Sequence, residues 1–297
     1  MPLPVAFTVD LEEWFHGPRA LGRHVRSEPE QVVDATRPIL DLIRRHRTHA
    51  TFFVVGEVAD RHPEIVEAIA REGHELACHG VTHRTLPELG AEGFRDELKR
   101  FRAIIEGAAG SRVPLAGFRA PVFSLDAGTA WAVPILTEFG YRYDSSVVPV
   151  RTPLYGAPRA PQQPYWPGDD DPTTRGTQRD LIEFPLSIFS FGPVRVPCGG
   201  GVYFRALPLP GYRWLLARAG AVAVFYIHPW ETHTATPRVG DMPWWHAKLR
   251  HHGYDRALRR IDDLLRDRRF AWGTMADVLE RSPMVRVSAK GGREGTR

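Results

Sequence analysis

Short apolar runs alternate with longer amphipathic segments along most of this 297-residue chain, and this alternation restricts its fold more than any other feature. The apolar runs are expected to form strands at Val5–Asp10, Ala50–Val55, Glu75–Cys78, Leu115–Phe118, Tyr141–Asp144, Val222–His228 and Phe270–Trp272. The segments between them repeat apolar residues every three or four positions, as amphipathic helices do, over Glu30–Arg45, Pro63–Glu72, Ala91–Ala108, Asp126–Phe139, Leu209–Ala219 and Tyr254–Arg266. This pattern predicts an α/β fold with a mostly parallel sheet, in the form of a distorted and incomplete (β/α)7-type barrel.

The regular alternation is interrupted between residues 150 and 201. This stretch is rich in proline and contains one β-like run, Leu181–Phe189. Because it lacks enough apolar residues for a core of its own, we interpret it as a loop insertion on one face of the barrel and not as a separate domain. The end of the chain, residues 282–297, is polar and rich in glycine, which predicts a disordered tail.

Composition and charge exclude several classes of protein. Apolar residues make up 43% of the chain, enough to fill one large core. The net charge of +4 comes from scattered arginines without a nucleic-acid-binding motif, so we expect no nucleic-acid partner. A role for this charge in holding an anionic polymer or a membrane surface stays open. The two cysteines, Cys78 and Cys198, lie far apart without a CxxC pattern, which predicts neither a disulfide framework nor a thiolate metal site.

Targeting signals are also missing from the sequence pattern. The N-terminus has no basic region, and Asp10 and Glu12 interrupt its apolar run too early for a secretory signal. The longest apolar run, Ala219–Ile227, is too short to span a bilayer, so no transmembrane segment is expected. We therefore expect a soluble, cytoplasmic protein in a reducing compartment.

Five of the predicted strands end in polar residues that are unusual beside a buried run: Asp10 with Glu12, His79 with His83, Arg119, Asp144 and His228. Each has an ordinary explanation on its own, such as a helix cap, a turn or a solvent-exposed side chain. In a βα barrel, however, the active site collects at the carboxyl ends of the strands. Their joint occurrence at five strand ends therefore predicts one shared site.

Two of these strand ends carry residue types that can bind a metal ion. The spacing H-x-x-x-H suits a metal, and Gly80 with its β-branched neighbours predicts that His79 and His83 converge from a loop and not from a helix. Since the chain has 13 histidines, this pair alone is weak evidence, but a nearby carboxylate would complete a three-ligand site. Strand alternation places Asp10 and Glu12 on one face and Glu13 on the other, which favours Glu12 as that ligand and leaves Glu13 as the alternative.

These residues resemble the motifs of the polysaccharide deacetylases, the carbohydrate esterases that share the nodulation-type chitooligosaccharide deacetylase domain. The similar segments are T-V-D-L-E at 8–12, H-G-V-T-H at 79–83, R-A-P at 119–121, the region of Asp144 and Y-I-H at 226–228. They stand in the order of the family, from residue 5 to about residue 230. One departure is that Leu11 fills the place where the commoner first motif has a second aspartate, so Glu12 is expected to replace it.

Further segments resemble the branch of this family associated with exopolysaccharide and exosortase loci: V-D-L-E-E-W-F-H, P-C-G-G-G-V-Y-F-R, I-H-P-W-E and F-A-W-G-T-M. The resemblance implies that residues 232–281 complete a single catalytic domain spanning 1–281. It also implies that the protein can associate peripherally with the envelope polysaccharide machinery, at the inner face of the membrane. The oligomeric state is not predicted.

The resemblance implies a hydrolase that removes N-acetyl groups from an amino-sugar-containing polysaccharide or its precursor. One divalent metal ion is expected on Glu12, His79 and His83, with zinc favoured and cobalt, nickel or manganese as alternatives. Asp10 is the expected general base. Its partner across the substrate is His228, the expected general acid that protonates the leaving amine.

The remaining motif residues are expected to support this pair. Arg119 would hold Asp10 charged and oriented, and Asp144 would do the same for His228. The residues expected to contact the sugar are Pro121, Phe123, Tyr203, Phe204 and Trp230. Two alternatives stay open: an amidohydrolase or O-acetyl esterase of the same fold that acts on a small molecule, and an inactive carbohydrate-binding homologue.

Overall fold

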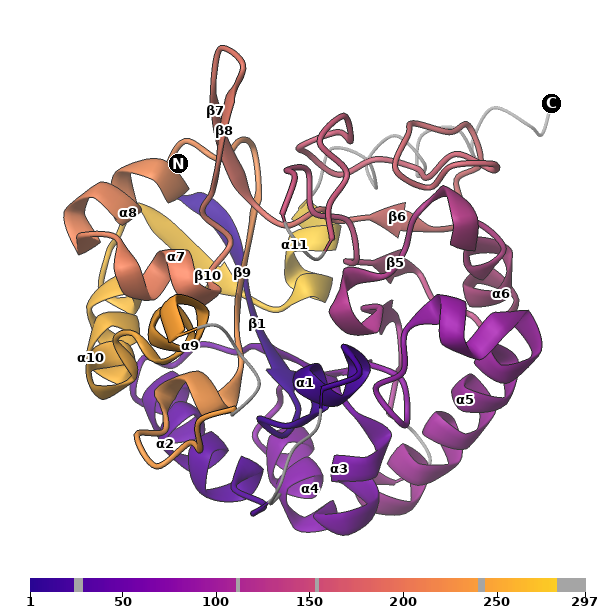
Figure 1. The fold of residues 1–297 in the computed structure, drawn as a ribbon, viewed down its shortest axis with the longest axis horizontal. Coiled ribbons are helices and arrows are strands. Elements are labelled where there is room, and N and C mark those ends of the chain that lie inside the picture. Colours follow the sequence, from indigo (N-terminus) through magenta and orange to yellow (C-terminus); the bar gives the residue numbers. More distant parts are fainter. Residues whose placement is uncertain (24–28, 111–112, 153–154, 240–243, 282–297) are drawn as a thin grey trace, which may run out of the picture.

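Eight parallel strands form one sheet, and seven of them follow one another around an open barrel at the centre of the molecule (Figure 1). The computed structural model describes residues 1–23, 29–110, 113–152, 155–239 and 244–281, so the predicted disordered tail lies outside the described residues. Around the barrel, the strands follow the order β9 (Ala223–Ile227), β1 (Leu3–Leu11), β2 (Thr51–Val54), β3 (Glu75–Cys78), β4 (Gly117–Phe118), β5 (Tyr143–Asp144) and β6 (Ile182–Glu183). The predicted distorted and incomplete α/β barrel is therefore confirmed.

Strand β1 is the central strand because it pairs along both of its edges. One edge pairs with β9, and the other pairs with β10 (Phe270–Gly273) at its start and with β2 at its end. Its residues from Val5 onward are buried, as expected for a nearly continuous apolar run in a parallel sheet. β1 thus carries Asp10 and Glu12 into the middle of the barrel's carboxyl end.

Helices ring the outside of the sheet (Figure 1) and bury its outer face. The outer layer consists of α2 (Val32–Arg45), α3 (Gly56–Arg61), α4 (Pro63–Arg71), α5 (Leu86–Ala109), α6 (Ala132–Glu138), α8 (Leu209–Leu216) and α10 (Tyr254–Leu265). Shorter helical segments connect the other elements: α1 (His16–Ala20), η1 (Pro121–Phe123), η2 (Ala127–Thr129), α7 (Gly201–Ala206), η3 (Pro229–Thr232), α9 (Trp244–His251) and α11 (Met275–Arg281).

The inserted region fills the gap between β6 and β9. It contains an antiparallel hairpin of β7 (Ile188–Phe191) and β8 (Val194–Pro197), as well as the last strand of the barrel, β6. At the base of the hairpin, the Tyr226 backbone N–H donates to the Gly199 carbonyl over 2.6 Å, and the Val224 N–H donates to Ser187 Oγ over 2.7 Å. These bonds satisfy the free edge of β9, which would otherwise expose unpaired backbone groups.

The C-terminal segment packs on the barrel end where the strands begin. The backbone N–H of Met275 donates to Thr51 Oγ1 over 2.7 Å, and that of Ala276 donates to Glu75 Oε2 over 3.0 Å. Both acceptors stand at the first residue of a strand, so α11 is fixed by its own N-terminal amide groups. None of the helices in the described part of the chain is long and apolar enough to cross a membrane.

Candidate functional site

The carboxyl ends of β1, β3, β4 and β9 bring five of the predicted residues together. Glu12 follows β1, while His79 follows β3, and both are buried. Arg119 follows β4 and is fully buried, and His228 follows β9. Asp10, near the end of β1, contacts the last two of these residues. The site therefore lies where barrel geometry places it.

Glu12, His79 and His83 form a buried cluster with the composition of a metal site. Their candidate ligand atoms all lie within 4.8 Å of one another. His83 Nε2 lies 2.6 Å from Glu12 Oε2, yet this buried oxygen has no hydrogen-bond partner. Two nitrogens and one carboxylate oxygen are the donor set of many catalytic zinc sites. The unsatisfied oxygen and the donor set both fit a bound cation.

The charge state of the cluster suits this interpretation. Burial alone would raise the pKa of Glu12, but the neighbouring imidazoles, His83 first, bring the pKa well below its ordinary value, so the carboxylate is ionised. Burial lowers the pKa of His79 to about 4, which keeps its imidazole neutral. Its Nδ1 lies 2.8 Å from the Arg119 carbonyl and donates to it, leaving Nε2 as the free lone pair. Metal ligands require these protonation states.

The loop from His79 to His83 has an unusual backbone that one buried acid stabilises. Gly80 and His83 have φ angles of 73° and 56°, in the left-handed region. Glu97 of α5 accepts hydrogen bonds from the Val81 backbone N–H over 2.6 Å and from the Thr82 hydroxyl. A Cβ atom at position 80 would lie 3.1 Å from Glu97 Oε2, which explains the glycine.

Our sequence analysis missed Glu97. The sequence does contain a sign of its role, because Glu97 stands between Phe94 and Phe101 on the apolar face of a predicted helix. A carboxylate that is buried on such a face needs hydrogen-bond partners.

Arg119 holds Asp10 by direct contact. Arg119 Nη1 lies 2.5 Å from Asp10 Oδ1, and the side chain is fixed by Nε, which donates to the Ser145 carbonyl over 3.0 Å, and by Nη2, which donates to Ser145 Oγ over 3.0 Å. The guanidinium also lies 4.0 Å from the centre of the Phe53 ring. Because Oδ1 is occupied by Arg119, Asp10 Oδ2 is the oxygen that faces the rest of the site.

His228 lies across from this carboxylate. Its Nε2 is 3.8 Å from Asp10 Oδ2 and 3.6 Å from Glu12 Oε1, and its Nδ1 is 3.2 Å from Glu231 Oε2. Burial lowers the pKa of His228, but Glu231, Glu12 and Asp10 together raise the pKa above its ordinary value. The Nε2 atom is therefore the one available to exchange a proton within the site.

The predicted role of Asp144 as the partner of His228 is wrong. Asp144 Oδ1 instead accepts from Ser146 Oγ over 2.6 Å, and Asp144 pairs in register with Glu183 of β6. Both carboxylate oxygens of Asp144 accept from Ser146, two residues further along the chain, whereas the imidazole of His228 faces Glu231. Ser146 Oγ in turn accepts from the Ala120 backbone N–H, so Asp144 supports the loop that carries Arg119.

Glu231 occupies the place expected for Asp144. It stands in η3, three residues after His228, and Oε2 also accepts from the His228 backbone N–H over 3.1 Å. Its other oxygen accepts from Arg205 of α7, with Nη2 at 2.8 Å and Nε at 3.1 Å. Burial raises the pKa of Glu231, but Arg205 and then His228 bring the pKa down to about 2. Sequence reasoning missed both residues, although they stand in I-H-P-W-E and in G-G-G-V-Y-F-R.

The residues predicted to contact sugar have different surroundings. Phe123 is partly buried and lines a groove of about 590 Å³ together with Tyr155, whose ring centre lies 4.9 Å away. Val122 and Phe123 have φ angles of 54° and 53°, which is strained for a β-branched residue and points to a constrained turn after the buried Pro121. Tyr203 is 39% exposed and lines a small pocket with Tyr155.

Two of the predicted sugar contacts lie inside the protein. Phe204 is fully buried and packs edge-to-face on Tyr212 and Phe225, so its predicted role in sugar binding is wrong. Trp230 is only 7% exposed and stacks on His228 with 4.6 Å between ring centres. Its Nε1 donates to Glu12 Oε1 over 3.2 Å, which orients this carboxylate from behind.

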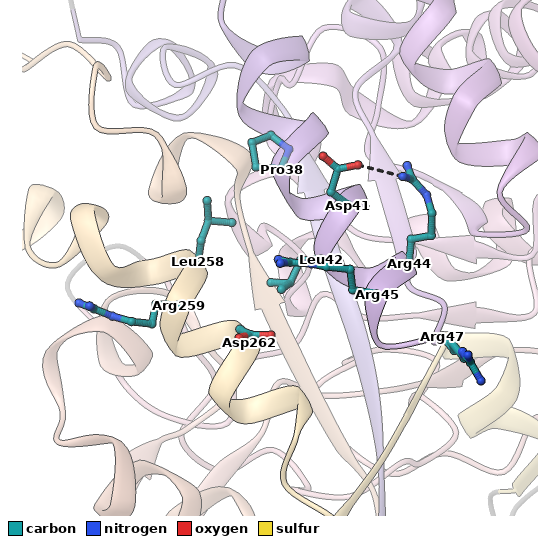
Figure 2. A pocket seen from close by; sticks show the side chains of 9 residues that line it. All are labelled: Pro38, Asp41, Leu42, Arg44, Arg45, Arg47, Leu258, Arg259 and Asp262. Atoms are coloured by element: carbon teal, nitrogen blue, oxygen red, sulfur yellow. Dashed lines mark hydrogen bonds and ion pairs between the residues drawn. The ribbon is translucent and has the colours of Figure 1, made fainter.

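A larger groove, of about 830 Å³, lies between α2 and α10 and contains none of the predicted site residues (Figure 2). Several arginines line it, but Arg47 and Arg259 point away from each other, and Arg44 is engaged by Asp41 (Figure 2). Its side chains do not converge on a common point. The groove therefore lacks the arrangement of a catalytic site.

Comparison with known proteins agrees with this geometry. Residues 27–143 match the family model described as "Polysaccharide deacetylase", and residues 145–280 match a "Domain of unknown function (DUF3473)". The chain is 31% identical over 171 residues to a chitooligosaccharide deacetylase of Bradyrhizobium sp. (strain ANU 289), which covers 51% of this chain and 75% of that protein.

Other relatives match over shorter stretches. Identity is 35% over 78 residues with a peptidoglycan-N-acetylglucosamine deacetylase of Bacillus cereus, covering 26% of this chain but only 28% of that protein. It is 40% over 73 residues with a chitooligosaccharide deacetylase of Rhizobium leguminosarum bv. trifolii, covering 25% of this chain and 34% of that protein.

Among solved structures, a Mycobacterium smegmatis protein provisionally assigned as a polysaccharide deacetylase superposes with a TM-score of 0.57. Its sequence identity is 24%, over 96% of this chain and 91% of that chain, so this likeness supports the fold. From the motif-bearing strand ends, the barrel and the Bradyrhizobium alignment, we conclude that the chain belongs to the polysaccharide deacetylase family.

Proposed function

We propose that this protein is a metal-dependent hydrolase that removes N-acetyl groups from an amino-sugar-containing polysaccharide of the cell envelope, such as an exopolysaccharide, or from its precursor. The observation that carries this proposal is the cluster of Glu12, His79 and His83 within reach of Asp10 and His228. A three-ligand cluster beside a carboxylate and an imidazole contains the groups that metal-assisted amide hydrolysis requires.

Glu12, His79 and His83 would hold one divalent ion, for which zinc is our first choice and cobalt, nickel or manganese are alternatives. When bound, such an ion polarises an acetyl carbonyl and makes a water molecule acidic enough to lose a proton near neutral pH. The support for this assignment is the buried Glu12 Oε2 that lacks a hydrogen bond and the neutral imidazole of His79.

Asp10 accepts the proton of the attacking water. Arg119 occupies Oδ1 and keeps the carboxylate in one orientation, so Oδ2 is the basic atom presented to the site. Ser145 holds Nε and Nη2 of Arg119, so the guanidinium that orients this carboxylate is itself fixed.

His228 donates a proton to the leaving amine from Nε2. An amine leaves poorly as an anion, so amide hydrolysis needs an acid at this position. Glu231 faces Nδ1 and fixes the ring with that nitrogen protonated, while Arg205 holds Glu231 from its other side. The base Asp10 thus contacts the cation Arg119, and the acid His228 contacts the anion Glu231.

The substrate class follows from the groove and from the relatives. Phe123 and Tyr155 line one groove, Tyr155 and Tyr203 line a small pocket, and the Phe123 ring centre lies 6.0 Å from the Arg119 guanidinium. Aromatic rings are common partners of sugar rings. The named relatives act on chitooligosaccharide and on peptidoglycan N-acetylglucosamine. Both substrates carry N-acetylhexosamine, which makes that unit our proposed target.

Acetate release from a panel of acetylated compounds tests this proposal. We expect release from N-acetylated glycans, with chelation abolishing it and metal restoring it. Release from O-acetylated glycans or from small ring amides alone would favour the esterase or amidohydrolase alternative. Glycan binding without acetate release, by protein loaded with metal, would show an inactive binding homologue.

A further inference from the structure

The β7–β8 hairpin ends in an exposed apolar tip. The four residues from Phe191 to Val194 are all exposed and none is charged. Phe191 is 77% exposed and Val194 is 55% exposed. In Figure 1 the hairpin projects beyond the rest of the fold. An apolar tip that is lifted away from the core contributes nothing to core packing, so both side chains are free to contact something outside the chain.

Helix α8 extends this apolar surface. Phe189 of β7 packs edge-to-face against Trp214, with 5.0 Å between ring centres, and Trp214 is 45% exposed. The Arg218 guanidinium lies over the same indole at 4.3 Å from its centre. A half-exposed tryptophan with an arginine beside it is the combination that proteins place at the headgroup level of a bilayer.

The hairpin and α8 carry no acidic residue, because no aspartate or glutamate stands between Glu183 and Glu231, where the average of the chain would give about five. Of the four arginines in the same stretch, Arg205 is buried against Glu231 and Arg213 pairs with Asp267, so Arg195 and Arg218 remain as the cations of this surface. Both strands of the hairpin and all of α8 are built from this acid-free segment. A surface with two arginines and no acid of its own favours an anionic partner.

We propose that the β7–β8 hairpin and α8 form a docking surface for an anionic lipid bilayer. Phe191 and Val194 insert at the boundary of the acyl chains, while Trp214 and Arg218 lie among the headgroups. A four-residue tip is far smaller than the roughly 800 Å² per partner that a stable protein interface buries. Apolar insertion combined with basic charge, by contrast, suffices for reversible membrane binding.

This surface is separate from the catalytic residues. The hairpin projects on the side of the molecule where β1 begins, whereas Glu12 and α1 follow the end of that strand (Figure 1). None of the four residues named for lipid contact belongs to the site described above. Lipid binding and hydrolysis of a soluble substrate should therefore be separable by mutation.

Vesicle co-sedimentation of the purified full chain tests the proposal. We expect binding to phosphatidylglycerol-rich vesicles and little binding to pure phosphatidylcholine. The double variant Phe191→Ser, Val194→Ser should bind roughly tenfold or more weakly, because it removes both inserting side chains. Its matched control is Leu249→Ser, which removes a 42% exposed leucine from α9 and should bind like wild type.

A charge reversal tests the headgroup contact. Arg218→Glu should weaken binding several-fold, and more so at low salt. Arg71→Glu is its control, since Arg71 is 71% exposed on α4 and the net charge changes equally. Acetate release from a soluble substrate should stay at the wild-type level in all four variants, which shows that they fold.

Three results would overturn the proposal. The first is no binding of wild type to anionic vesicles. The second is equal binding by wild type and the double tip variant. The third is a dimer in analytical ultracentrifugation that the tip variant abolishes, which would assign the hairpin to a second copy of the chain.

Discussion

The turn after β9 and the adjoining ends of β5 and β6 both bury carboxylates, but their surroundings shift the pKa values of these groups in opposite directions. After β9, Glu231 lies between Arg205 and His228, and these two cations outweigh burial and lower its pKa to about 2. At the end of β6, burial and then the neighbouring Asp144 raise the pKa of Glu183 well above its ordinary value. The surroundings therefore favour the ionised form of Glu231 and the protonated form of Glu183.

The difference shows that a buried acid at a strand end acquires its role from its neighbours. An ionised Glu231 can orient an imidazole that exchanges protons. The pair of Asp144 and Glu183 binds backbone and hydroxyl groups instead, since the Val147 N–H donates to Glu183 over 2.9 Å and Ser146 Oγ donates to Asp144 over 2.6 Å. We assign catalysis to the first cluster and positioning of the Arg119 loop to the second.

The largest effect should come from the imidazole that the first cluster supports. His228→Ala should retain the metal and lower acetate release from N-acetylated glycans by about 10²–10⁴-fold, the usual contribution of a general acid. The defect should shrink on an activated aryl acetate, whose leaving group needs no proton. An equal loss on both substrates would contradict the general-acid role of His228. It would also contradict the assignment of catalysis to the cluster of Glu231, Arg205 and His228.

A smaller loss is expected for Glu231→Gln, at about 10–100-fold in kcat/KM, because the amide no longer favours the correct protonation of His228. The variant also leaves the buried Arg205 without its anion, so its free energy of unfolding should fall. Measurement of kcat/KM and of urea denaturation separates the two effects. A folded Glu231→Gln variant with wild-type kcat/KM would show that Glu231 does not support catalysis by His228.

Asp144→Asn should lose less than about tenfold in kcat/KM, since an amide oxygen can still accept from Ser146 Oγ and keep the loop in place. Steady-state kinetics beside Glu231→Gln give the ranking. If Asp144→Asn is impaired more than Glu231→Gln, the assignment of the two clusters is reversed and Asp144 acts on His228 after all.

The smallest effect is a pH dependence of stability. The raised pKa of Glu183 means that the folded protein holds a proton that the unfolded chain releases. This stabilisation is complete below the unfolded pKa and is lost as the pH rises toward the folded pKa, by up to about 1.4 kcal/mol per pH unit. Urea denaturation at several pH values should show a shallower decline for Glu183→Gln. Parallel curves for wild type and variant would mean that Glu183 is ionised.

Sequence reasoning reached the features that depend on local pattern. The strand positions came from apolar runs, and the grouping of Asp10, Glu12, His79 and His83 followed from barrel geometry. These features are local because a strand end fixes where its next few side chains lie.

Most of the errors concern contacts between distant segments, whereas Glu231 stands only three residues after His228, the residue that it contacts. Nothing near Asp144 in the chain indicates that β6 places Glu183 beside it, or that Arg205 reaches Glu231. Phe204 was misassigned because G-V-Y-F forms a helix, in which Tyr203 and Phe204 point about 100° apart and only one can face solvent. Which of the two side chains is buried depends on how α7 packs on the barrel, and the sequence alone does not give this packing.

The measurement that tests the central claim most directly is metal stoichiometry and acetate release of wild type, Glu12→Gln and Glu13→Gln in one metal buffer. Glu13 caps α2, because its Oε1 accepts from the backbone N–H groups of Gln31 and Val32 at 2.9 Å, and glutamine can keep these bonds. We predict about one ion per chain for wild type and Glu13→Gln, and metal binding more than about tenfold weaker for Glu12→Gln, with acetate release following the metal. The opposite ranking of the two variants, or full acetate release by rigorously metal-free wild type, would contradict the account.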